Sequence, residues 1–454
     1  MNMSIDAVLQ DREAKGQPIR VGMVGAGATG RAISMQLGTP VVPGMRLVGI
    51  ANRTPEHGKR AFREGGIEGW HHAGSACEAE AAISRGVPVL TDDPSVLTAC
   101  GAIDIIVEVT GTVDPALCVV LDSFDHGKHV VMVNAELDSL LGPILKMKAD
   151  QAGVVVTNTD GDEPGVAMTL LRYLRSLGLR PVAAGNIKGM VDHYRTPETQ
   201  KGFAEKYDQD PRKVTSFADA TKLSMETTVL ANATGFHVGR RGMYGPACGN
   251  VREIAQLLPA DQMLATGLVD YSLGAVPHTG AFVVVHEEAP LKRAQLTYYR
   301  LGDGPFFTFY TPFHLPYLQI VSTIARAVIH KDPTVAAIAG PVCEVLTVAK
   351  RNLKAGERLD GVGGFCTYGL IDNATKARAL TALPISLSEG CVLRREILKD
   401  SVISFDDVDS PSGRLSETLW REQAARWPIM TQKSEDQSSL QAPVGRPLTP
   451  VGHI

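Results

Sequence analysis

One stretch of sequence constrains the fold of this chain more than any other. Residues 19–24, Ile-Arg-Val-Gly-Met-Val, form an apolar run that predicts a buried β-strand, and the run leads directly into a glycine-rich turn. Gly25, Gly27 and Gly30 have the G-x-G-x-x-G spacing of dinucleotide-binding sheets. An ordinary strand-to-helix turn is the alternative, but the strand before the glycines and the helix-compatible residues after them favour a Rossmann-type unit.

The glycines of this turn predict a dinucleotide site because each has a separate role. The first allows a tight turn, the second lets a pyrophosphate approach the backbone, and the third lets the helix pack closely on the strand. The N-terminus of the helix adds amide donors and a partial positive charge. We therefore expect a nicotinamide dinucleotide to bind at Gly25, Ala26, Gly27, Thr29 and Gly30.

The end of the second expected strand indicates which dinucleotide binds. Residues 45–51 are apolar and lead to Asn52 and Arg53, about 20 residues past the glycines, where an NAD-dependent enzyme carries an acid for the ribose hydroxyls. No acid stands there, and the guanidinium of Arg53 suits the 2′-phosphate of NADP. A solvated basic loop is the alternative. We expect NADPH as the cofactor, with Asn52 and Arg53 among its contacts.

Length and composition place the chain among soluble globular proteins of two or three domains. It has 454 residues, of which 44% are hydrophobic and 21% charged, and its formal net charge is −4. This charge gives no reason to expect nucleic acid or an anionic membrane as a partner, and no apolar run reaches the ~20 residues that span a bilayer. The seven cysteines lack metal-ligand spacing and no signal sequence is visible, so we expect a cytoplasmic protein.

Apolar strands alternate with helix-length segments along the first third of the chain. Further strands are expected at residues 87–90, 103–109, 129–133 and 154–157. This alternation predicts an α/β fold with a doubly wound parallel sheet that is covered by helices on both faces. Between two of these strands, residues 65–86 are rich in Gly, Ala and acids, and we expect an exposed surface loop there, including His71 and His72.

The carboxyl ends of parallel strands meet at one edge of a sheet and form the cofactor crevice. Two of the expected strands end in polar or glycine residues that would reach this crevice. We therefore expect the nicotinamide half of the cofactor to lie near Glu108, Thr110, Gly111, Asn134 and Glu136.

Beyond residue 158 the pattern changes to a mixture of helices and strands. A helix is expected at 166–177 and a strand at 182–187, and residues 281–285 and 294–300 look like strands of a second, largely antiparallel sheet. A helix at 318–329 ends this region. Such a region can pack back on the nucleotide domain, so the domain boundaries need not be simple cuts.

The last part of the chain changes character again. Short strands between glycine and proline turns predict a small β-rich module, and the final residues are polar apart from a helix expected at 416–427. We therefore expect four parts: 1–158 as an NADP-binding Rossmann domain, 159–335 as a central α+β substrate and oligomerisation domain, 336–408 as a small β-rich domain, and 409–454 as a C-terminal tail.

Several motifs resemble one family across nearly the whole chain. Residues 127–131, followed by Asn134, resemble the equivalent strand of homoserine dehydrogenases. Residues 217–226 and 231–235 are similar to homoserine-dehydrogenase-like oxidoreductases that carry a C-terminal SAF domain, which the β-rich module from about 340 to 408 resembles. Length and motifs are most similar to the branch that acts as a 1-deoxy-D-xylulose 5-phosphate reductoisomerase. The resemblance implies a homo-oligomer, either a dimer or a tetramer.

One position departs from this family. Homoserine dehydrogenases typically carry a lysine near the nicotinamide in an Ala-Asn-Lys run, whereas this chain has Asn134, Ala135 and Glu136. A carboxylate in place of a cation argues against a simple homoserine dehydrogenase and leaves the redox half of the chemistry intact.

A reductoisomerase must rearrange a ketose phosphate and then pass hydride to the resulting aldehyde. It therefore needs a divalent metal, a cationic pocket for the phosphate and an acid or base near the migrating carbons. Mg²⁺ and Mn²⁺ prefer carboxylate oxygens, and Asp160, Asp162 and Glu163 stand together at an expected strand-to-helix turn. We expect them to bind the metal; capping of the following helix is the alternative.

Basic residues beyond this turn are candidates for the reaction and for binding the phosphorylated sugar. Lys188 ends an apolar strand, where a surface lysine is unexpected, and Lys222 and Glu226 lie four apart on an expected helix. We expect these three residues to be catalytic, although Lys222 and Glu226 also suit a simple ion pair. The expected substrate-binding residues are Arg195, Lys201, Arg240, Arg241 and His314.

The resemblance and these residues together predict one reaction. It is the NADPH- and divalent-metal-dependent conversion of 1-deoxy-D-xylulose 5-phosphate to 2-C-methyl-D-erythritol 4-phosphate, a step of isoprenoid precursor synthesis. Two alternatives stay open: a dehydrogenase of another small hydroxy-aldehyde, and an NADP-sensing regulatory protein without turnover.

Overall fold

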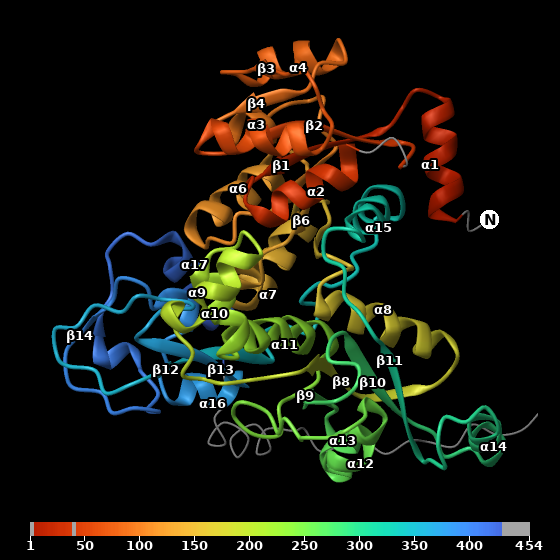
Figure 1. Cartoon of the computed structure of the whole chain (residues 1–454), viewed down its shortest axis with the longest axis vertical. Helices are drawn as coiled ribbons and strands as arrows, with labels where there is room; N and C mark the ends of the chain where they lie inside the picture. The colour runs from red at the N-terminus through yellow and green to blue at the C-terminus, as the bar shows by residue number, and fades with distance from the viewer. Residues whose placement is uncertain (1–3, 39–41, 429–454) are drawn as a thin grey trace, which may run out of the picture.

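The computed structural model describes residues 4–38 and 42–428 (Figure 1). A seven-stranded sheet lies at one end of the molecule, and a four-stranded sheet and a C-terminal module of short strands lie at the other. Helix α11 (Thr221–Thr234) runs between these parts and packs against both the four-stranded sheet and the C-terminal module. No helix in the two described ranges is both long and apolar enough to cross a membrane.

The first sheet has seven parallel strands in the order β3-β4-β2-β1-β5-β6-β7. The strands are β1 (Ile19–Val24), β2 (Met45–Ala51), β3 (His71–His72), β4 (Val89–Thr91), β5 (Ile105–Glu108), β6 (His129–Met132) and β7 (Val156–Asn158). Strands β4 to β7 are buried along their whole length, as expected for a sheet with helices on both faces. The predicted doubly wound parallel sheet is confirmed.

Strands β1 and β5 are neighbours, and from them the chain builds the sheet outward in opposite directions: β2, β4 and β3 lie beyond β1, and β6 and β7 lie beyond β5. The carboxyl ends of β1 and β5 therefore border the crevice in which ligands bind to such sheets. The helices that connect the strands are α2 (Ala28–Gly38), α3 (Pro55–Glu64), α4 (Ala76–Ser84), α5 (Ser95–Thr98), α6 (Asp114–Asp125) and α7 (Ala135–Gln151). Helix α2 starts directly after the glycine turn.

The prediction of a loop at residues 65–86 is wrong. This segment contains the edge strand β3 and helix α4, although both histidines of β3 are exposed as expected. Ser75 accepts a hydrogen bond from the backbone N–H of Glu78 at 3.3 Å and so caps α4. A Ser followed three residues later by Glu is a sequence signal for a helix start, and the high glycine content of the segment obscured it.

A later segment returns to the first sheet. Helix α15 (Ile320–Ala325) and the π-helical turn η2 (Arg326–His330) confirm the helix predicted at 318–329. Ile320, Ile324 and Ala327 belong to the same apolar core as β1 and β2, and α15 also contacts the N-terminal helix α1 (Ile5–Ala14). The expected domain boundaries stay a prediction.

The second sheet has the strand order β11-β10-β8-β9. Its strands are β8 (Arg180–Lys188), β9 (Leu268–Leu273), β10 (Ala281–His286) and β11 (Phe306–Thr311). Strand β10 runs antiparallel to both neighbours, whereas β8 and β9 are parallel. Helix α8 (Glu163–Ser176) packs on one side of the sheet, and two short helices follow η1 (Val251–Glu253): α12 (Ile254–Leu257) and α13 (Ala260–Ala265).

The strand predicted at residues 294–300 is wrong, because this part of the chain forms helix α14 (Pro290–Tyr298). Pro290 stands in the first turn, where its fixed backbone angle suits a helix, and the following Leu, Lys, Arg, Ala and Gln residues are good helix formers. The two tyrosines at the end of the segment favoured a strand.

The C-terminal module is built on a hairpin of β12 (Cys343–Ala349) and β13 (Thr367–Asn373), which packs on α11. Its other elements are α16 (Ala374–Ala379), η3 (Ile385–Leu387), β14 (Val392–Leu393), η4 (Phe405–Asp407), β15 (Val408–Asp409) and α17 (Leu415–Arg426). Helix α17 confirms the helix predicted at 416–427 and packs on α6 and α7. The rest of the expected tail lies outside the described residues, and the likeness of the module to a SAF domain stays a prediction.

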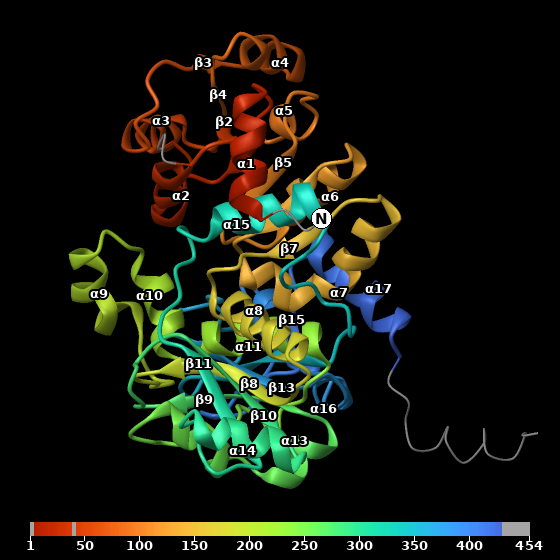
Figure 2. The same ribbon diagram turned by 90° about the vertical axis from the view of Figure 1, so that its right-hand side faces the viewer.

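Two helices, α9 (Pro197–Lys206) and α10 (Pro211–Ala218), project beside the body of the molecule (Figure 2). Each begins with a capping residue followed by proline. The turn between them reaches the first sheet, because Asp208 Oδ2 lies 2.7 Å from Arg31 Nη2 on α2 and 3.1 Å from Arg60 Nη2 on α3. The α9–α10 segment is thereby tied to the nucleotide-binding region at its tip.

A buried ion pair connects the C-terminal module to the start of α11. Lys350 Nζ donates to Asp219 Oδ2 at 2.9 Å and to the carbonyl oxygens of Arg195 and Gly364 at 2.7 and 2.9 Å. The other oxygen of Asp219 accepts from the backbone N–H of Thr221, the first residue of α11, at 2.9 Å. Both charged side chains are almost fully buried.

Replacement of Lys350 by methionine should lower the free energy of unfolding by roughly 3–5 kcal/mol, because Asp219 would be left as a buried charge without its partner. Urea unfolding followed by circular dichroism measures this change. Lys354→Met removes an exposed lysine of the same module and should change stability by less than about 0.5 kcal/mol. Equal stability of Lys350→Met and the unaltered protein would contradict the role given to this ion pair.

Candidate active site

A cavity of about 720 Å³ lies between the carboxyl edge of the first sheet and the second sheet. It extends from Thr29 at the start of α2 to Glu226 on α11, with the α9–α10 segment along one wall. Its charged residues are four acids, Glu136, Asp162, Glu163 and Glu226, and three lysines, Lys188, Lys213 and Lys222. One space therefore joins the predicted dinucleotide turn to most of the predicted catalytic residues.

The glycine turn has the geometry that a dinucleotide requires. Gly25 has a φ of +110°, a backbone conformation that residues with a side chain rarely adopt. A Cβ on Gly30 would lie 2.5 Å from the carbonyl oxygen of Gly25. A Cβ on Gly27, in contrast, would meet no atom within 4 Å. The open space at Gly27 fits the approach of a pyrophosphate, and the crowding at the other two explains why they are glycines.

Asn52 holds the glycine turn in place. Its Oδ1 accepts from the backbone N–H of Ala26 at 3.0 Å, and its Nδ2 donates to the carbonyl oxygen of Thr54 at 2.8 Å. Arg53 beside it is exposed and has no ion pair or side-chain hydrogen bond within the described residues. Its guanidinium is therefore free to bind an anion, and its role in NADP recognition stays a prediction.

Glu108 and Asn134 stabilise the turns on the nicotinamide side of the crevice through hydrogen bonds. The carboxylate of Glu108 is fully buried and accepts from Thr110 N and Asn134 Nδ2, each at 2.8 Å. Burial raises the pKa of Glu108 above its ordinary value. Of the residues predicted here, Gly111 and Glu136 face the cavity, whereas Glu108, Thr110 and Asn134 set the shape of the turns around it.

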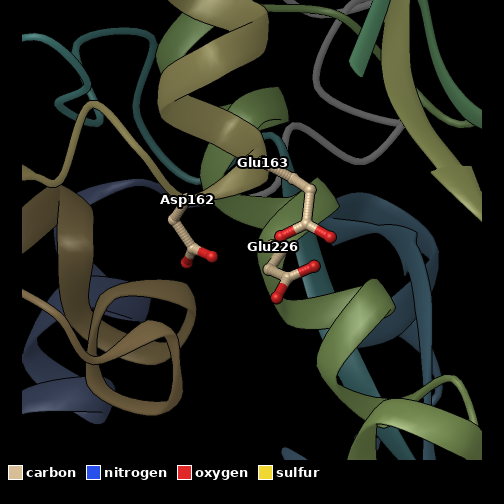
Figure 3. Close-up of side chains that lie close together, drawn as sticks. All are labelled: Asp162, Glu163 and Glu226. Carbon is tan, nitrogen blue, oxygen red and sulfur yellow. The ribbon is translucent and has the colours of Figure 1, made fainter. Parts of the chain in front are cut away.

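Three carboxylates converge at the other end of the cavity (Figure 3). Asp162 and Glu163 stand at the start of α8, and Glu226 reaches them from α11. One oxygen from each lies within 4.8 Å of the others, which is close enough for all three to bind one ion. Carboxylate oxygens are the donors that Mg²⁺ and Mn²⁺ prefer, so this set fits a divalent metal.

Two lysines compensate the charge of these acids. Lys188 Nζ lies 2.6 Å from Glu163 Oε1 and 3.6 Å from Glu226 Oε2, and Lys222 Nζ lies 3.3 Å from Glu136 Oε2. Burial alone would lower the pKa of both lysines, but the neighbouring carboxylates raise it above the ordinary value. Both side chains are therefore charged at neutral pH and act as proton donors in hydrogen bonds.

The three clustered acids differ in their affinity for protons. Burial and the neighbouring Glu163 raise the pKa of Asp162 to about 6 and raise that of Glu226 well above its ordinary value. Burial also acts on Glu163, but Lys188 and then His314 lower its pKa to about 2. Carboxyl groups with such different proton affinities in one cavity are typical of sites that combine acid, base and metal chemistry.

Two further contacts orient the cluster. Asn186 on β8 donates from Nδ2 to Glu226 Oε2 at 3.0 Å. His314 Nε2 lies 3.7 Å from Glu163 Oε2, and its Nδ1 shares a hydrogen bond of 2.9 Å with Thr279 Oγ1. His314 therefore lies in the cavity as predicted, next to the acids.

Asp160 does not join the predicted metal site, and this part of the prediction is corrected. Its carboxylate is buried and accepts from Ser322 Oγ at 2.7 Å and from Thr334 Oγ1, and Arg326 Nη1 lies 3.7 Å away. These partners come from the segment that returns to the first sheet, so Asp160 anchors that segment. Glu226, predicted as catalytic, takes the place of Asp160 in the acid cluster.

Four predicted substrate-binding residues also lie outside the cavity. Arg195 pairs with Asp192 at 2.9 Å and Arg241 with Asp372 at 2.9 Å. Arg240 donates to the carbonyl oxygens of Met243 and Tyr244, and Lys201 is exposed on α9 away from the cavity lining. Basic residues in glycine-rich or polar segments suggested phosphate binding, but nearby residues bind Arg195 and Arg240, and the distant Asp372 binds Arg241.

Lys213, His278 and Thr279 line the cavity, although the sequence analysis did not single them out. The pair Asp210-Pro211 is a typical helix start, and it would have indicated that Lys213 stands in the first turn of a helix. His278 and Thr279 lie between β9 and β10 and carry no recognisable local signal.

Residues 161–320 match the family model described as "Oxidoreductase DRL, catalytic domain". The match covers about a third of the chain and includes the three clustered acids and the three lysines of the cavity. No curated protein matches the chain. The central region is therefore similar to an oxidoreductase catalytic domain.

The chain is also similar to several solved structures. A homoserine dehydrogenase from Thiobacillus denitrificans is 17% identical, with a TM-score of 0.40 over 75% of this chain and 83% of that one. An oxidoreductase from Agrobacterium radiobacter, solved with NAD⁺, L-tartaric acid and magnesium, is 11% identical, with a TM-score of 0.38 over 71% and 92%. An apo scyllo-inositol dehydrogenase from Lactobacillus casei is 11% identical, with a TM-score of 0.40 over 70% and 89%. These distant likenesses carry no conclusion about substrate, cofactor or metal.

Replacement of Gly27 and of Gly30 by alanine should have different effects on stability and on dinucleotide binding. Gly27→Ala should leave the stability unchanged within about 0.5 kcal/mol but weaken dinucleotide binding at least tenfold, because the new methyl group fills the space of the pyrophosphate. Gly30→Ala should destabilise the protein by roughly 1–3 kcal/mol, because its methyl group collides with the backbone. Urea unfolding and fluorescence titration with NADPH measure both effects. Normal NADPH affinity in Gly27→Ala would rule out this binding mode.

Asp162 should lower the stability of the protein at neutral pH. The folded protein keeps the Asp162 proton up to about pH 6, whereas the unfolded chain releases it near 3.8, so ionisation opposes folding above this window. Asp162→Asn should therefore be more stable than the unaltered protein at pH 7 by on the order of 1 kcal/mol, an advantage that shrinks as the pH falls from 6 to 4. Urea unfolding across this pH range measures it, with the exposed Asp92→Asn as control. A less stable Asp162→Asn at pH 7 would contradict the prediction.

Proposed function

We propose that this protein is an NADPH- and divalent-metal-dependent reductoisomerase that converts 1-deoxy-D-xylulose 5-phosphate to 2-C-methyl-D-erythritol 4-phosphate. The observation that carries the proposal is the single cavity that joins the dinucleotide turn to three convergent carboxylates and two paired lysines. The match of residues 161–320 to an oxidoreductase catalytic domain supports it, because that region contains the acids and the lysines.

The cofactor would bind along the carboxyl edge of the first sheet. Its pyrophosphate would lie at Gly27 and the start of α2, and its nicotinamide would lie toward Gly111 and Glu136, which face the cavity. The free guanidinium of Arg53, in a position without an acid, supports NADPH over NADH.

Asp162, Glu163 and Glu226 would hold the divalent metal, which when bound polarises the neighbouring oxygens of the ketose. Their fit to a metal is supported by their convergence, since one oxygen of each lies within 4.8 Å of the others. Asn186 would keep the Glu226 carboxylate in place through its hydrogen bond to Oε2.

The rearrangement moves one carbon–carbon bond while a proton leaves a hydroxyl oxygen and another reaches the former carbonyl oxygen. The Glu226 carboxyl group, whose pKa is raised by burial and by Glu163, suits the exchange of such a proton. Lys188 would donate a hydrogen bond to a substrate oxygen from its position against Glu163. The resulting aldehyde would then accept hydride at its carbon.

Lys222 would assist the reduction. Its ammonium lies against Glu136, which follows β6 at the nicotinamide side, so it is positioned to donate a proton to the aldehyde oxygen as hydride reaches the carbon. Lys222 also compensates for a difference from homoserine dehydrogenases. The cation that they carry after the asparagine is absent here, and Lys222 brings a cation to the same end of the cavity from α11.

A dehydrogenase that works on another small hydroxy-aldehyde without a metal is the second candidate. The ion pairs of Lys188 favour it, because they compensate the charge of the acid cluster without any added ion.

For both candidate functions we expect the chain to form a homo-oligomer, which light scattering on the purified protein would test.

The decisive assay is NADPH oxidation by the purified protein with 1-deoxy-D-xylulose 5-phosphate, with and without Mn²⁺ or Mg²⁺. We expect turnover that requires the metal, and a loss of at least about a hundredfold in kcat for Glu226→Gln, because both a metal ligand and a proton carrier are removed. Electron paramagnetic resonance of Mn²⁺ should show weaker metal binding by Glu226→Gln.

Glu68→Gln, which alters an exposed acid of the first domain, is the matched control and should behave as the unaltered protein. Metal-independent reduction of other aldehydes would replace the proposal by the second candidate. Tight NADPH binding without turnover of any aldehyde would instead favour a sensor.

A further inference from the structure

Among the described residues, three lysines line the cavity, and only one has no partner. Lys188 pairs with Glu163 and Lys222 with Glu136. Lys213 makes neither an ion pair nor a side-chain hydrogen bond, although it stands beside a cavity that contains four carboxylates. A charged group left without a partner beside a ligand cavity is available to an anionic ligand.

The fold holds Lys213 at a defined place. It lies in the first turn of α10, where Asp210 Oδ1 accepts from the backbone N–H of Arg212 at 2.7 Å and from that of Lys213 at 3.3 Å. Its ammonium lies over Gly111, 3.2 Å from the position that a Cβ on Gly111 would occupy. Gly111 follows β5, which pairs with β1, so this ammonium stands near the start of the dinucleotide site.

Lys213 lines a second hollow as well. This hollow has a volume of about 390 Å³ and shares Gly111 and Glu136 with the main cavity. The charge of Lys213 also reaches into the main cavity. Burial would raise the pKa of Glu136, but Lys222 and, to a smaller extent, Lys213 lower it.

The segment that carries Lys213 covers the cavity. Phe203 on α9 and Phe217 on α10 line the cavity wall and are about half exposed, at 54% and 49%, so a bound ligand would cover apolar surface next to the ammonium. The tip of the segment is tied to α2 and α3 through Asp208. The segment is thereby held beside the main body of the molecule, below α2 and α3 in the view of Figure 2.

We propose that Lys213 binds a phosphate group in this cavity, a role that the sequence suggested for Arg195, Lys201, Arg240 and Arg241. The phosphate would belong to the phosphorylated substrate or to the diphosphate of the cofactor, since the cavity that Lys213 lines extends from the start of α2 to the acid cluster. The identity of the substrate rests on the proposed function, but phosphate binding by Lys213 does not depend on the reaction.

The test measures two affinities in Lys213→Gln. NADPH binding is followed by fluorescence titration, and binding of inorganic phosphate to the NADPH-saturated protein is followed by ³¹P nuclear magnetic resonance. We expect one of the two to weaken about tenfold, the effect commonly seen when a charge-assisted hydrogen bond is lost. Lys213→Arg keeps the charge and should retain most of the affinity.

Lys206→Gln removes an exposed lysine of the neighbouring helix α9 that does not line the cavity, and it should change neither affinity. Weaker phosphate binding with unchanged NADPH affinity would support the proposal and assign Lys213 to the substrate. Weaker NADPH binding would support it and assign Lys213 to the cofactor. If Lys213→Gln binds both as tightly as the unaltered protein, the proposal is overturned.

Failure of this proposal can be distinguished from failure of the proposed reaction. If 1-deoxy-D-xylulose 5-phosphate is not turned over, the reductoisomerase assignment fails, whereas the two binding measurements still report on Lys213.

Discussion

The ion pair between Lys188 and Glu163 is the interaction on which the centre of this molecule depends. Glu163 and Glu226 are almost fully buried, and two carboxylates so close together repel each other and lose their hydration. The ammonium of Lys188, 2.6 Å from one and 3.6 Å from the other, offsets both costs. The same ion pair connects the last residue of β8 to the first turn of α8, so it also ties this helix to the sheet on which it packs.

Helix α11 brings the remaining charges to the same place. It is buried along most of its length, and yet it carries Lys222 and Glu226 on the side that faces the cavity. Its first turn is held by Asp219, which is itself held by Lys350 of the C-terminal module. The C-terminal module therefore contributes to the site without lining the main cavity, because it determines where α11 starts.

The charged residues of the cavity differ from a purely structural ion-pair network in one respect. Among the residues that the structure describes, Asp162 has no lysine within ion-pair distance and its pKa is raised, while Lys213 has no carboxylate within that distance. A network that served only stability would pair Asp162, because its burial makes an uncompensated charge costly. Lys213 is exposed, so its charge stays hydrated and open to a ligand. Unpaired charges of both signs at a cavity that starts at a dinucleotide turn are better explained by ligands that carry the opposite charges.

The sequence by itself determined the parts of this protein that depend on local pattern: the glycine turn, the alternation of strands and helices, and the acids at the start of α8. It could not determine which side chains meet. The prediction that Asp160 joins the metal site was therefore wrong, and four basic residues expected in the site lie elsewhere. Glu136 and Lys222 are 86 residues apart, and Arg241 meets Asp372 across the boundary to the C-terminal module. Backbone conformation follows from neighbouring residues, whereas the partner of a charged side chain is decided only when distant elements pack together.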